Sequence, residues 1–506
     1  MLALFVRNRN ILAILSLLAI LTLSFNADAA DQDLFDVYSL EIQGEIYNFL
    51  IGDFDGDALS DVVVIYSPFN DFNSRYISLY LQKKNIGFRP VADYLVLLPS
   101  SAAQVNAADI DGDSESEICI VDSEGLSVLN LTKNIGFSSP VRLISYKTIY
   151  SIPQFQGIIT DPFLFDINNS SGPEIVLPSP KGYVIFERGD DVTYQILNQI
   201  TAPIIGHSAG KSVRDFMGHL SSDLNISSGS IQVIDGNLDG RNDIYLLWAK
   251  KLCCYFQDAT GNFSQTPDLD IDFYPANAQG YFQSRLADIN GDRMPDIILS
   301  RTSGGMTNAE TKIRIYLAGT GGRIQSAFKK EITLSDSHCN LLIGDVSGDG
   351  NPDMIVPTIE LGALAATKMF LMKKADLHLL IYTFHSGVPA DEPTRRTKYE
   401  FRFDFDDPQP LSEVSLDWTG EYNGDGISDL VFSDGNGMLQ FFWGKRDGEQ
   451  SKRSDLEIAL NHPLEIHPVH LNHGILFDAI IEHKSGGEAG RLTILKNKNN
   501  KNIQGM

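Results

Sequence analysis

The chain has 506 residues, of which 43% are apolar and 10% aromatic, and its formal net charge at pH 7 is −25. A chain this acidic repels nucleic acid and anionic membrane surfaces and attracts cations, so nucleic acid is excluded as a partner. The apolar and aromatic content excludes a disordered chain, and the four cysteines are too few for a disulfide scaffold of this size.

The first element in the chain is an apolar run. Arg7 and Arg9 precede residues 11–25, and the small residues Ala27 and Ala29 follow them. This order predicts a signal peptide over residues 1–29, cleaved after Ala29, and therefore an extracytoplasmic (secreted or periplasmic) protein. The alternative is an uncleaved N-terminal anchor. No later segment is long and apolar enough to span a bilayer, so we expect no membrane span after cleavage.

An acidic motif follows a strand-like segment, VYSLEIQG (37–44). The motif reads IGDFDGDALSDVVV (51–64) and places Asp53, Asp55, Asp57 and Asp61 close together. Two such charges about 4 Å apart repel by roughly 4 kcal/mol at an effective dielectric of about 20. The acids must therefore either splay into water or share a cation.

The motif is a repeat. Measured from its first acid as position 1, it recurs about every 55 residues, with longer gaps before Asp235 and before Glu421. An eroded eighth copy at 470–481 keeps His470, Asn472, Gly474 and Asp478 in register. The clear copies after the first are AADIDGDSESEICIV (107–121), LFDINNSSGPEIVL (164–177), VIDGNLDGRNDIYLL (233–247), LADINGDRMPDIILS (286–300), IGDVSGDGNPDMIVP (343–357) and TGEYNGDGISDLVF (419–432).

Each copy leads into an apolar strand. Positions 10 to 12 are apolar in all seven clear copies, which is typical of a strand covered on both faces, and alternating segments such as 75–82, 312–318 and 377–384 follow. Four short strands per repeat predict an all-β fold, a single β-propeller over residues 30–498. Eight blades are favoured, and seven remain if the eighth copy is accidental. The last unit, ending at 491–497, lacks one strand, which 37–44 would supply to close the ring. We expect residues 499–506 to form a disordered basic tail.

The repeated loops predict metal sites. Positions 1, 3, 5 and 9 offer side-chain oxygens, glycine at position 4 permits a tight turn, and position 7 would add a backbone carbonyl. Such an all-oxygen cage suits Ca²⁺, with up to seven sites. The candidate ligands are Asp53, Asp55, Asp57, Leu59 and Asp61; Asp109, Asp111, Asp113, Glu115 and Glu117; Asp166, Asn168, Ser170, Gly172 and Glu174; Asp235, Asn237, Asp239, Arg241 and Asp243; Asp288, Asn290, Asp292, Met294 and Asp296; Asp345, Ser347, Asp349, Asn351 and Asp353; and Glu421, Asn423, Asp425, Ile427 and Asp429.

Affinity is expected to differ among the copies. The first and second carry four carboxylates each and should bind best, whereas the third has only two and the fourth has Leu238 in place of the turn glycine. EF-hands are excluded, because position 12 is apolar in every clear copy where an EF-hand needs a glutamate. The remaining alternative is a set of solvated acidic turns, since Asp, Asn and Gly favour turns without any metal.

The loops GDFDGDALSD, ADINGDRMPD, GDVSGDGNPD and GEYNGDGISD resemble the FG-GAP (VCBS-type) repeats of the integrin-alpha-like β-propeller family. The resemblance extends over nearly the whole chain after the leader, and the third copy departs most, at Ser170 and Gly172. It implies a Ca²⁺-bound extracytoplasmic propeller, commonly adhesive or ligand-binding, but no particular reaction, because families on this fold differ in function.

Two further motifs have simpler explanations. Residues 206–210 (GHSAG) match the nucleophile elbow G-x-S-x-G, but the βαβ context that this motif requires is missing, so a chance match is favoured. The histidines His462, His467, His470 and His473 have no common zinc spacing, and prolines interrupt the segment, so loop histidines are favoured over a transition-metal site.

Two insertions, residues 201–230 and a segment that includes residues 360–376, carry the least repetitive sequence, and the second predicts a short helix that either packs on the ring or binds a partner. Cys119 and Cys339 are expected to be buried thiols. The adjacent Cys253 and Cys254 should not be bonded to each other, because neighbours on a strand point to opposite faces.

The sequence favours a non-enzymatic module that binds a glycan or an extracytoplasmic protein. The alternative is a carbohydrate-active enzyme, such as a polysaccharide lyase on the same ring. A lyase needs a base and a cationic charge neutraliser that converge in a groove, and the sequence shows no such set.

Overall fold

The computed structural model describes residues 34–500, apart from gaps at 72–73, 151–157, 160, 169–171, 190–192, 204, 209–223, 228, 305–307, 336, 361, 403–414, 434–436, 447–452, 461–462, 473 and 484–489. The predicted signal peptide and residues 501–506 of the predicted tail lie outside the described residues. Asn500 is hydrogen-bonded to the eighth copy, where its Nδ2 donates to the carbonyl of Leu476 (2.7 Å).

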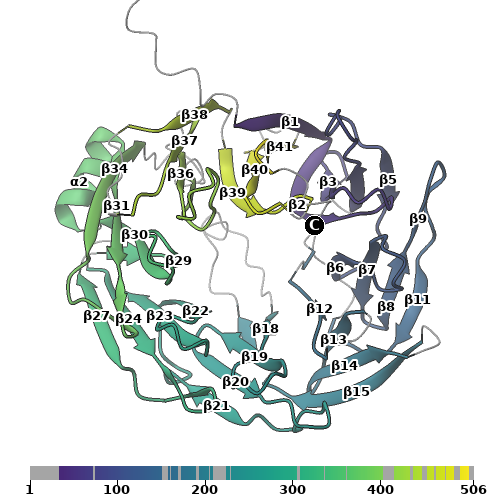
Figure 1. Cartoon of the computed structure of the whole chain (residues 1–506), viewed down its shortest axis with the longest axis horizontal. Coiled ribbons are helices and arrows are strands. Elements are labelled where there is room, and N and C mark those ends of the chain that lie inside the picture. Colours follow the sequence, from purple (N-terminus) through teal and green to yellow (C-terminus); the bar gives the residue numbers. More distant parts are fainter. Residues whose placement is uncertain are drawn as a thin grey trace, which may run out of the picture.

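The fold is the predicted all-β propeller. Eight antiparallel sheets of four main strands follow one another around a ring (Figure 1). In each blade the first strand lies innermost and later strands lie progressively further out, as the order β2-β3-β4-β5 of the first blade shows. The eight-bladed prediction is therefore confirmed over the alternative of seven.

The first four blades have the following strands. Blade 1 contains β2 (Gly44–Gly52), β3 (Asp61–Pro68), β4 (Tyr76–Tyr80) and β5 (Tyr94–Leu97). Blade 2 contains β6 (Gln104–Ala108), β7 (Glu117–Asp122), β8 (Gly125–Leu129) and β11 (Val141–Ser145), with the hairpin β9 (Leu131–Thr132) and β10 (Gly136–Phe137). Blade 3 contains β12 (Leu164–Phe165), β13 (Glu174–Ser179), β14 (Gly182–Arg188) and β15 (Tyr194–Thr201). Blade 4 contains β18 (Ser230–Ile234), β19 (Asp243–Trp248), β20 (Lys251–Tyr255) and β21 (Leu269–Asp272).

The other four blades complete the ring. Blade 5 contains β22 (Tyr281–Ala287), β23 (Asp296–Ser303), β24 (Glu310–Tyr316) and β27 (Lys330–Ser335), with the hairpin β25 (Ala318–Gly319) and β26 (Arg323–Ile324). Blade 6 contains β28 (Ser337–Cys339) and β29 (Leu342–Gly344), both paired with β30 (Asp353–Glu360), then β31 (Lys374–Tyr382) and β34 (Arg395–Arg402), with the hairpin β32 (Phe384–His385) and β33 (Val388–Pro389). Blade 7 contains β35 (Ser415–Asp417), β36 (Leu430–Ser433), β37 (Met438–Phe442) and β38 (Leu456–Ala459). Blade 8 contains β39 (Pro463–Val469), β40 (Asp478–His483), β41 (Gly490–Asn497) and β1 (Phe35–Ile42).

The two ends of the described chain close the ring, as predicted. β1 pairs antiparallel with β41 from Phe35 opposite Asn497 to Ile42 opposite Gly490. The N-terminal strand is therefore the outer strand of the last blade, and it covers the edge that β41 would otherwise expose.

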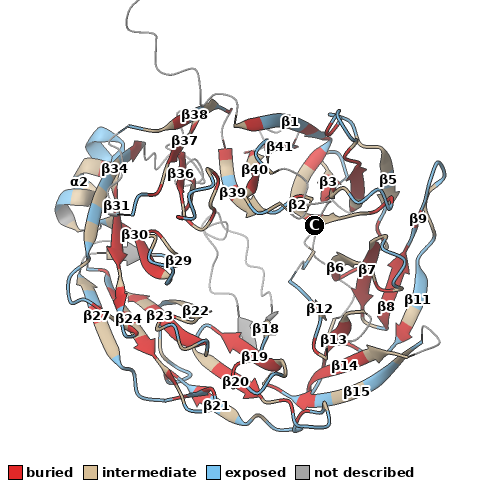
Figure 2. Cartoon of the chain, viewed as in Figure 1, coloured by how far each residue is buried: buried red, intermediate tan, exposed pale blue. Residues whose placement is uncertain are grey.

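Each pair of neighbouring blades shares its own hydrophobic core. The second strands are buried along their length, as in β3, where Val62 and Val64 face blade 8 and Val63 and Ile65 face blade 2. Figure 2 shows this burial following the middle strands, while the outer strands consist mostly of intermediate and exposed residues. A strand with apolar residues on both faces is what the runs at positions 10 to 12 predicted.

The second insertion forms the predicted helix. α2 (Ala363–Met372) lies on the outer rim beside β31 and β34 (Figure 1). Met369 is buried in the core between blades 6 and 7, and Lys368 Nζ pairs with Asp376 (2.7 Å) and Glu400 (2.8 Å). The helix is thus anchored by one face, whereas Leu364 and Leu371 remain 88% and 80% exposed.

Cys119, Cys253 and Cys254 are buried free thiols, which confirms the expectation for Cys119 and the absence of a bond between Cys253 and Cys254. The side chain of Cys339 lies outside the described residues. In the part of the chain that the structure describes, no helix is long and apolar enough to cross a membrane.

Candidate metal sites

The repeated acidic motifs form the loops between the first and second strands of the blades. We number each loop by its blade, so loop 1 is Asp53–Asp61 and loop 8 is His470–Asp478. In six loops positions 4 and 6 both have a positive φ, for example 66° at Gly56 and 63° at Ala58. Leu238 has the same conformation (62°) in loop 4, so that loop keeps its backbone without the glycine, at a position where a side chain is strained.

This backbone wraps around the first acid. In loop 1 the carboxylate of Asp53 accepts hydrogen bonds from the backbone N–H groups of Gly56 (2.8 Å), Asp57 (3.2 Å) and Ala58 (2.8 Å). The first aspartates of loops 2, 4, 5 and 6 accept equivalent bonds. The acid at position 5 accepts from the N–H of position 7, as between Asp57 and Leu59 (3.0 Å). The turn would therefore form without a metal, and the remaining carboxylate lone pairs stay available.

The acid at position 9 is the buried anchor of all eight loops. In loop 1, Asp61 is fully buried and accepts from the N–H of Phe54 (3.0 Å) and, across the blade, from that of Gln82 (2.8 Å). Burial raises the pKa of seven of these acids because it disfavours the charged form. The raised values are about 7 for Asp61, Glu117 and Asp429, and about 6 for Asp243, Asp296, Asp353 and Asp478.

These shifts predict an unusual pH dependence for the metal-free protein. The folded state holds these protons more tightly than the unfolded chain, whose Asp and Glu pKa values are near 4. Stability is therefore greatest below about pH 4 for this set and is lost as the pH rises through about 6 to 7. Without metal, we expect the melting temperature to be higher at pH 5 than at pH 8, by about 5 °C or more.

Scanning calorimetry of protein stripped of divalent ions on a chelating resin measures this difference. With calcium in excess we expect the order to reverse, because protons and the cation compete for the same carboxylates. A metal-free melting temperature that falls on acidification from pH 8 to pH 5 would contradict the prediction.

Loops 1 and 2 gather their acids most closely. In loop 1, oxygens of Asp53, Asp55 and Asp57 lie within 4.8 Å of one another, and in loop 2 the same holds for Asp109, Asp111 and Glu117. These are the two loops with a carboxylate at each of positions 1, 3, 5 and 9. Asp57 and Asp111 have raised pKa values, first through burial and further through the charges of the neighbouring acids.

Among the described residues, the Oδ1 atom of Asp55, at position 3 of loop 1, is buried and has no hydrogen-bond partner. A buried oxygen without a partner destabilises the fold unless it binds an ion or water. The sequence assigned this position to a metal ligand, so the residues of loop 1 fit a hard cation such as Ca²⁺.

Protein cations lie beside some of the loops. Lys83 Nζ pairs with Oδ2 of Asp55 (2.7 Å), and Lys133 lies 3.4 Å from Glu115. In loop 4 the guanidinium of Arg241, at position 7, pairs with Asp239 and donates to the carbonyl of Gln257 (3.1 Å). Arg241 thus supplies positive charge where a metal would otherwise neutralise Asp239.

Neighbouring loops are bonded to one another. The carbonyl at position 1 accepts an N–H from position 8 of the next loop, between Asp53 and Ser116 (2.6 Å), Asp345 and Ser428 (2.9 Å), and Glu421 and Phe477 (2.9 Å). Loop 8 is bonded to loop 1 through Asn472, whose Oδ1 accepts from the N–H of Ser60 (2.7 Å). Main-chain bonds of this kind leave no side-chain pattern, so the sequence could not reveal them.

The candidate ligands of loops 3, 5 and 7 complete the comparison with the sequence prediction. Ser170 of loop 3 lies outside the described residues, although Glu174 accepts from the N–H of Ile167 (2.7 Å) like the other position-9 acids. In loops 5 and 7 the amide nitrogens of Asn290 and Asn423 donate to the acid at position 5, at 3.0 and 3.2 Å.

The histidine prediction needs a correction. His467 lies in strand β39, not in a loop. Prolines do not interrupt this strand, because β39 is the edge of its sheet and Pro463 and Pro468 therefore remove no essential ladder bond. His462 and His473 lie outside the described residues.

Gly206, His207 and Ser208 of the GHSAG motif lie in β16 (Ile205–Ser208), which pairs with β17 (Leu224–Ser227). Residues 209–210 of the motif lie outside the described residues.

Comparison with known proteins bears on the repeat. Residues 53–120 match the model of the FG-GAP-like repeat, and no curated protein matches the sequence. Among solved structures, the chain is similar to an Agrocybe aegerita lectin that recognises non-reducing terminal N-acetylglucosamine (12% identity, 92% of this chain and 96% of that chain, TM-score 0.41). It is also similar to a Lactobacillus plantarum protein (9% identity, 69% and 83%, TM-score 0.34) and to the Photorhabdus luminescens Tc holotoxin pore (15% identity, 89% and 20%, TM-score 0.29). The chain is an eight-bladed β-propeller that carries an FG-GAP-like repeat.

Proposed function

We propose that this chain is an extracytoplasmic, calcium-stabilised β-propeller that binds a glycan or a protein partner. The FG-GAP propeller fold supports a binding or adhesion module. The observation that carries the calcium proposal is loop 1, where three carboxylates lie within 4.8 Å of one another and the buried Oδ1 of Asp55 has no partner.

Calcium would be held by side-chain oxygens at positions 1, 3, 5 and 9 with the carbonyl of position 7. Bound there, it would neutralise the acids and fix the loop; loops 1 and 2, with the most carboxylates, should bind it best. Because the loops are bonded to their neighbours, the cation would stabilise contacts between blades as well as its own turn. The role that we propose for calcium is therefore to stabilise the folded propeller, not to take part in a reaction.

The exposed face of α2 supports a protein partner. Leu364, Phe370, Leu371 and Met372 are 88%, 63%, 80% and 62% exposed, although Met369 of the same helix is buried in the core between blades 6 and 7. Large apolar side chains grouped on a surface are typical of contacts with other macromolecules. The localisation rests on the apolar run of residues 11–25, which the sequence identifies as part of a signal peptide.

A glycan array, run with the calcium-loaded chain beside a lyase assay on acidic polysaccharides, tests the binding function. Calcium-dependent binding of a defined glycan without cleavage would support the glycan partner. The protein partner would be supported by two results together. The chain binds no glycan, and a purified surface protein binds the wild-type chain but not the double variant Leu364→Ser/Leu371→Ser. Cleavage of a polysaccharide would overturn the non-catalytic proposal.

A further inference from the structure

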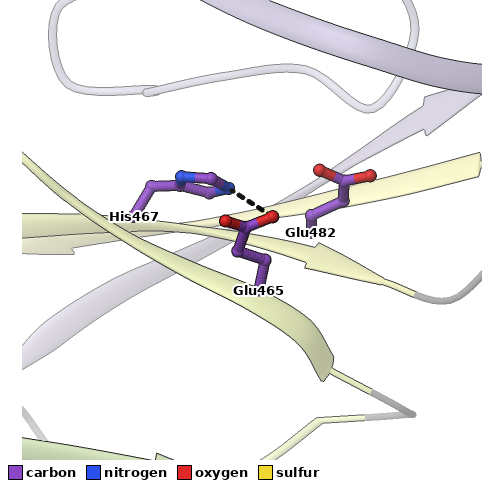
Figure 3. Close-up of side chains that lie close together, drawn as sticks. All are labelled: Glu465, His467 and Glu482. Carbon is purple, nitrogen blue, oxygen red and sulfur yellow. Dashed lines mark ion pairs between the residues drawn. The ribbon is translucent and has the colours of Figure 1, made fainter. Parts of the chain in front are cut away.

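Three potential metal ligands meet in the closing blade, away from the acidic loops. Glu465 and His467 lie two residues apart on β39, and Glu482 lies on β40 directly opposite Glu465. One ligand atom from each lies within 4.8 Å of the other two. Figure 3 shows the three side chains projecting on the same side of the strands, with the carboxylate of Glu465 between the other two groups.

The pairing of the two glutamates is unfavourable by itself. Like charges directly opposite one another on adjacent strands destabilise a sheet. Among the described residues, no lysine or arginine forms an ion pair with either glutamate, and the imidazole of His467 lies 3.9 Å from Glu465. The cluster therefore lacks a counter-charge.

The imidazole of His467 is presented as a ligand. Its Nε2 is shielded from solvent and has no hydrogen-bond partner, and it lies 3.9 Å from Oε2 of Glu465, too far for a hydrogen bond. The ring of Phe49, from blade 1, packs edge-on against it with centroids 5.0 Å apart. Burial lowers the pKa of His467.

We propose that Glu465, His467 and Glu482 form a binding site for a borderline transition-metal cation of the Zn²⁺ type. One imidazole nitrogen and two carboxylates are a three-ligand set that leaves one tetrahedral position open. The nitrogen selects against Ca²⁺ and Mg²⁺, which prefer oxygen alone, so this site is chemically distinct from the loops.

Titration of the full chain with Zn²⁺ in saturating Ca²⁺, followed by calorimetry, tests the site. We expect one Zn²⁺ per chain, with affinity lowered by about tenfold or more in His467→Ala and in Glu482→Gln. The matched control is His378→Ala, which removes another histidine that pairs with a single glutamate, Glu360 (3.4 Å), and should leave Zn²⁺ affinity unchanged. Binding of equal affinity in His467→Ala, or no binding to the wild-type chain, would overturn the proposal.

A second measurement separates metal binding from a structural role. Glu482→Gln keeps the side-chain shape and removes one of the two like charges. In metal-free buffer at pH 8 we therefore expect it to melt higher than wild type, while it loses the rise in melting temperature that Zn²⁺ gives the wild-type chain. If Glu482→Gln retained the full Zn²⁺-dependent rise, the glutamate would not be a ligand. The absorption spectrum of the Co²⁺-loaded chain also tests the histidine. If the spectra of the wild-type chain and of His467→Ala were the same, His467 would not be a ligand.

Discussion

Removal of calcium with EDTA is expected to lower the melting temperature by about 5 °C or more. A site occupied at about 100 times its dissociation constant contributes about 2.7 kcal/mol, and each kcal/mol corresponds to roughly 1 °C for a domain of this length. Two such sites, loops 1 and 2, are sufficient for this shift. Calcium should restore the melting temperature better than magnesium, because Mg²⁺ demands octahedral geometry and dehydrates reluctantly.

The same experiment on single variants assigns the effect to a loop. Asp55→Asn removes the acid whose Oδ1 is buried and unpartnered, so it should lose about 2 °C of the calcium-dependent rise and stay close to wild type in EDTA. Asp391→Asn is the matched control, since it removes an acid that is 89% exposed and pairs with Lys330 outside the loops. A melting temperature that EDTA leaves unchanged would defeat the calcium proposal, as would an equal loss in both variants.

Much of the fold could be predicted because it depends on local, repeated signals. The apolar residues at positions 10 to 12 became the buried second strands, and β1 closed the ring because the last unit had only three strands of its own. The acids at position 9 were recognised as part of the motif. Their role as buried hydrogen-bond acceptors could not be predicted, because the donors lie on other parts of the folded blade. Asp61, for example, accepts from the N–H groups of Phe54 and Gln82.

What sequence could not show depends on pairing between distant residues. Glu465 and Glu482 are opposed only in the register of β39 against β40, and a bulge between Pro463 and Glu465 shifts that register. His467 was interpreted as a loop residue because proline usually ends a strand, yet an edge strand tolerates it. The pairing of Lys83 with Asp55 joins residues from different strands, so no spacing in the motif indicates it.

Deletion of the closing strand should have the largest effect of all. A chain that starts after Ile42 loses β1, exposes the edge of β41 and uncovers Leu492 and Ile494, which pack with Leu40 between blades 8 and 1. We expect this chain to be insoluble or to lack a cooperative thermal transition, whereas a chain that starts at Leu34 should melt like the full chain. Circular dichroism and calorimetry make the comparison.

A point variant in β1 tests whether the truncated chain is unstable because the ring is no longer closed or only because the chain is shorter. Leu40 is fully buried and Val37 is 51% exposed on the same strand. Leu40→Asp places an unpaired charge in the core between blades and should cost more than about 5 kcal/mol, whereas Val37→Asp should cost less than about 1 kcal/mol. A synthetic peptide of residues 34–43, added to the chain that starts after Ile42, should restore a cooperative melt, and the same peptide with Leu40→Asp should not. If the chain without β1 melted cooperatively at the wild-type temperature, the strand would cover the ring without closing it.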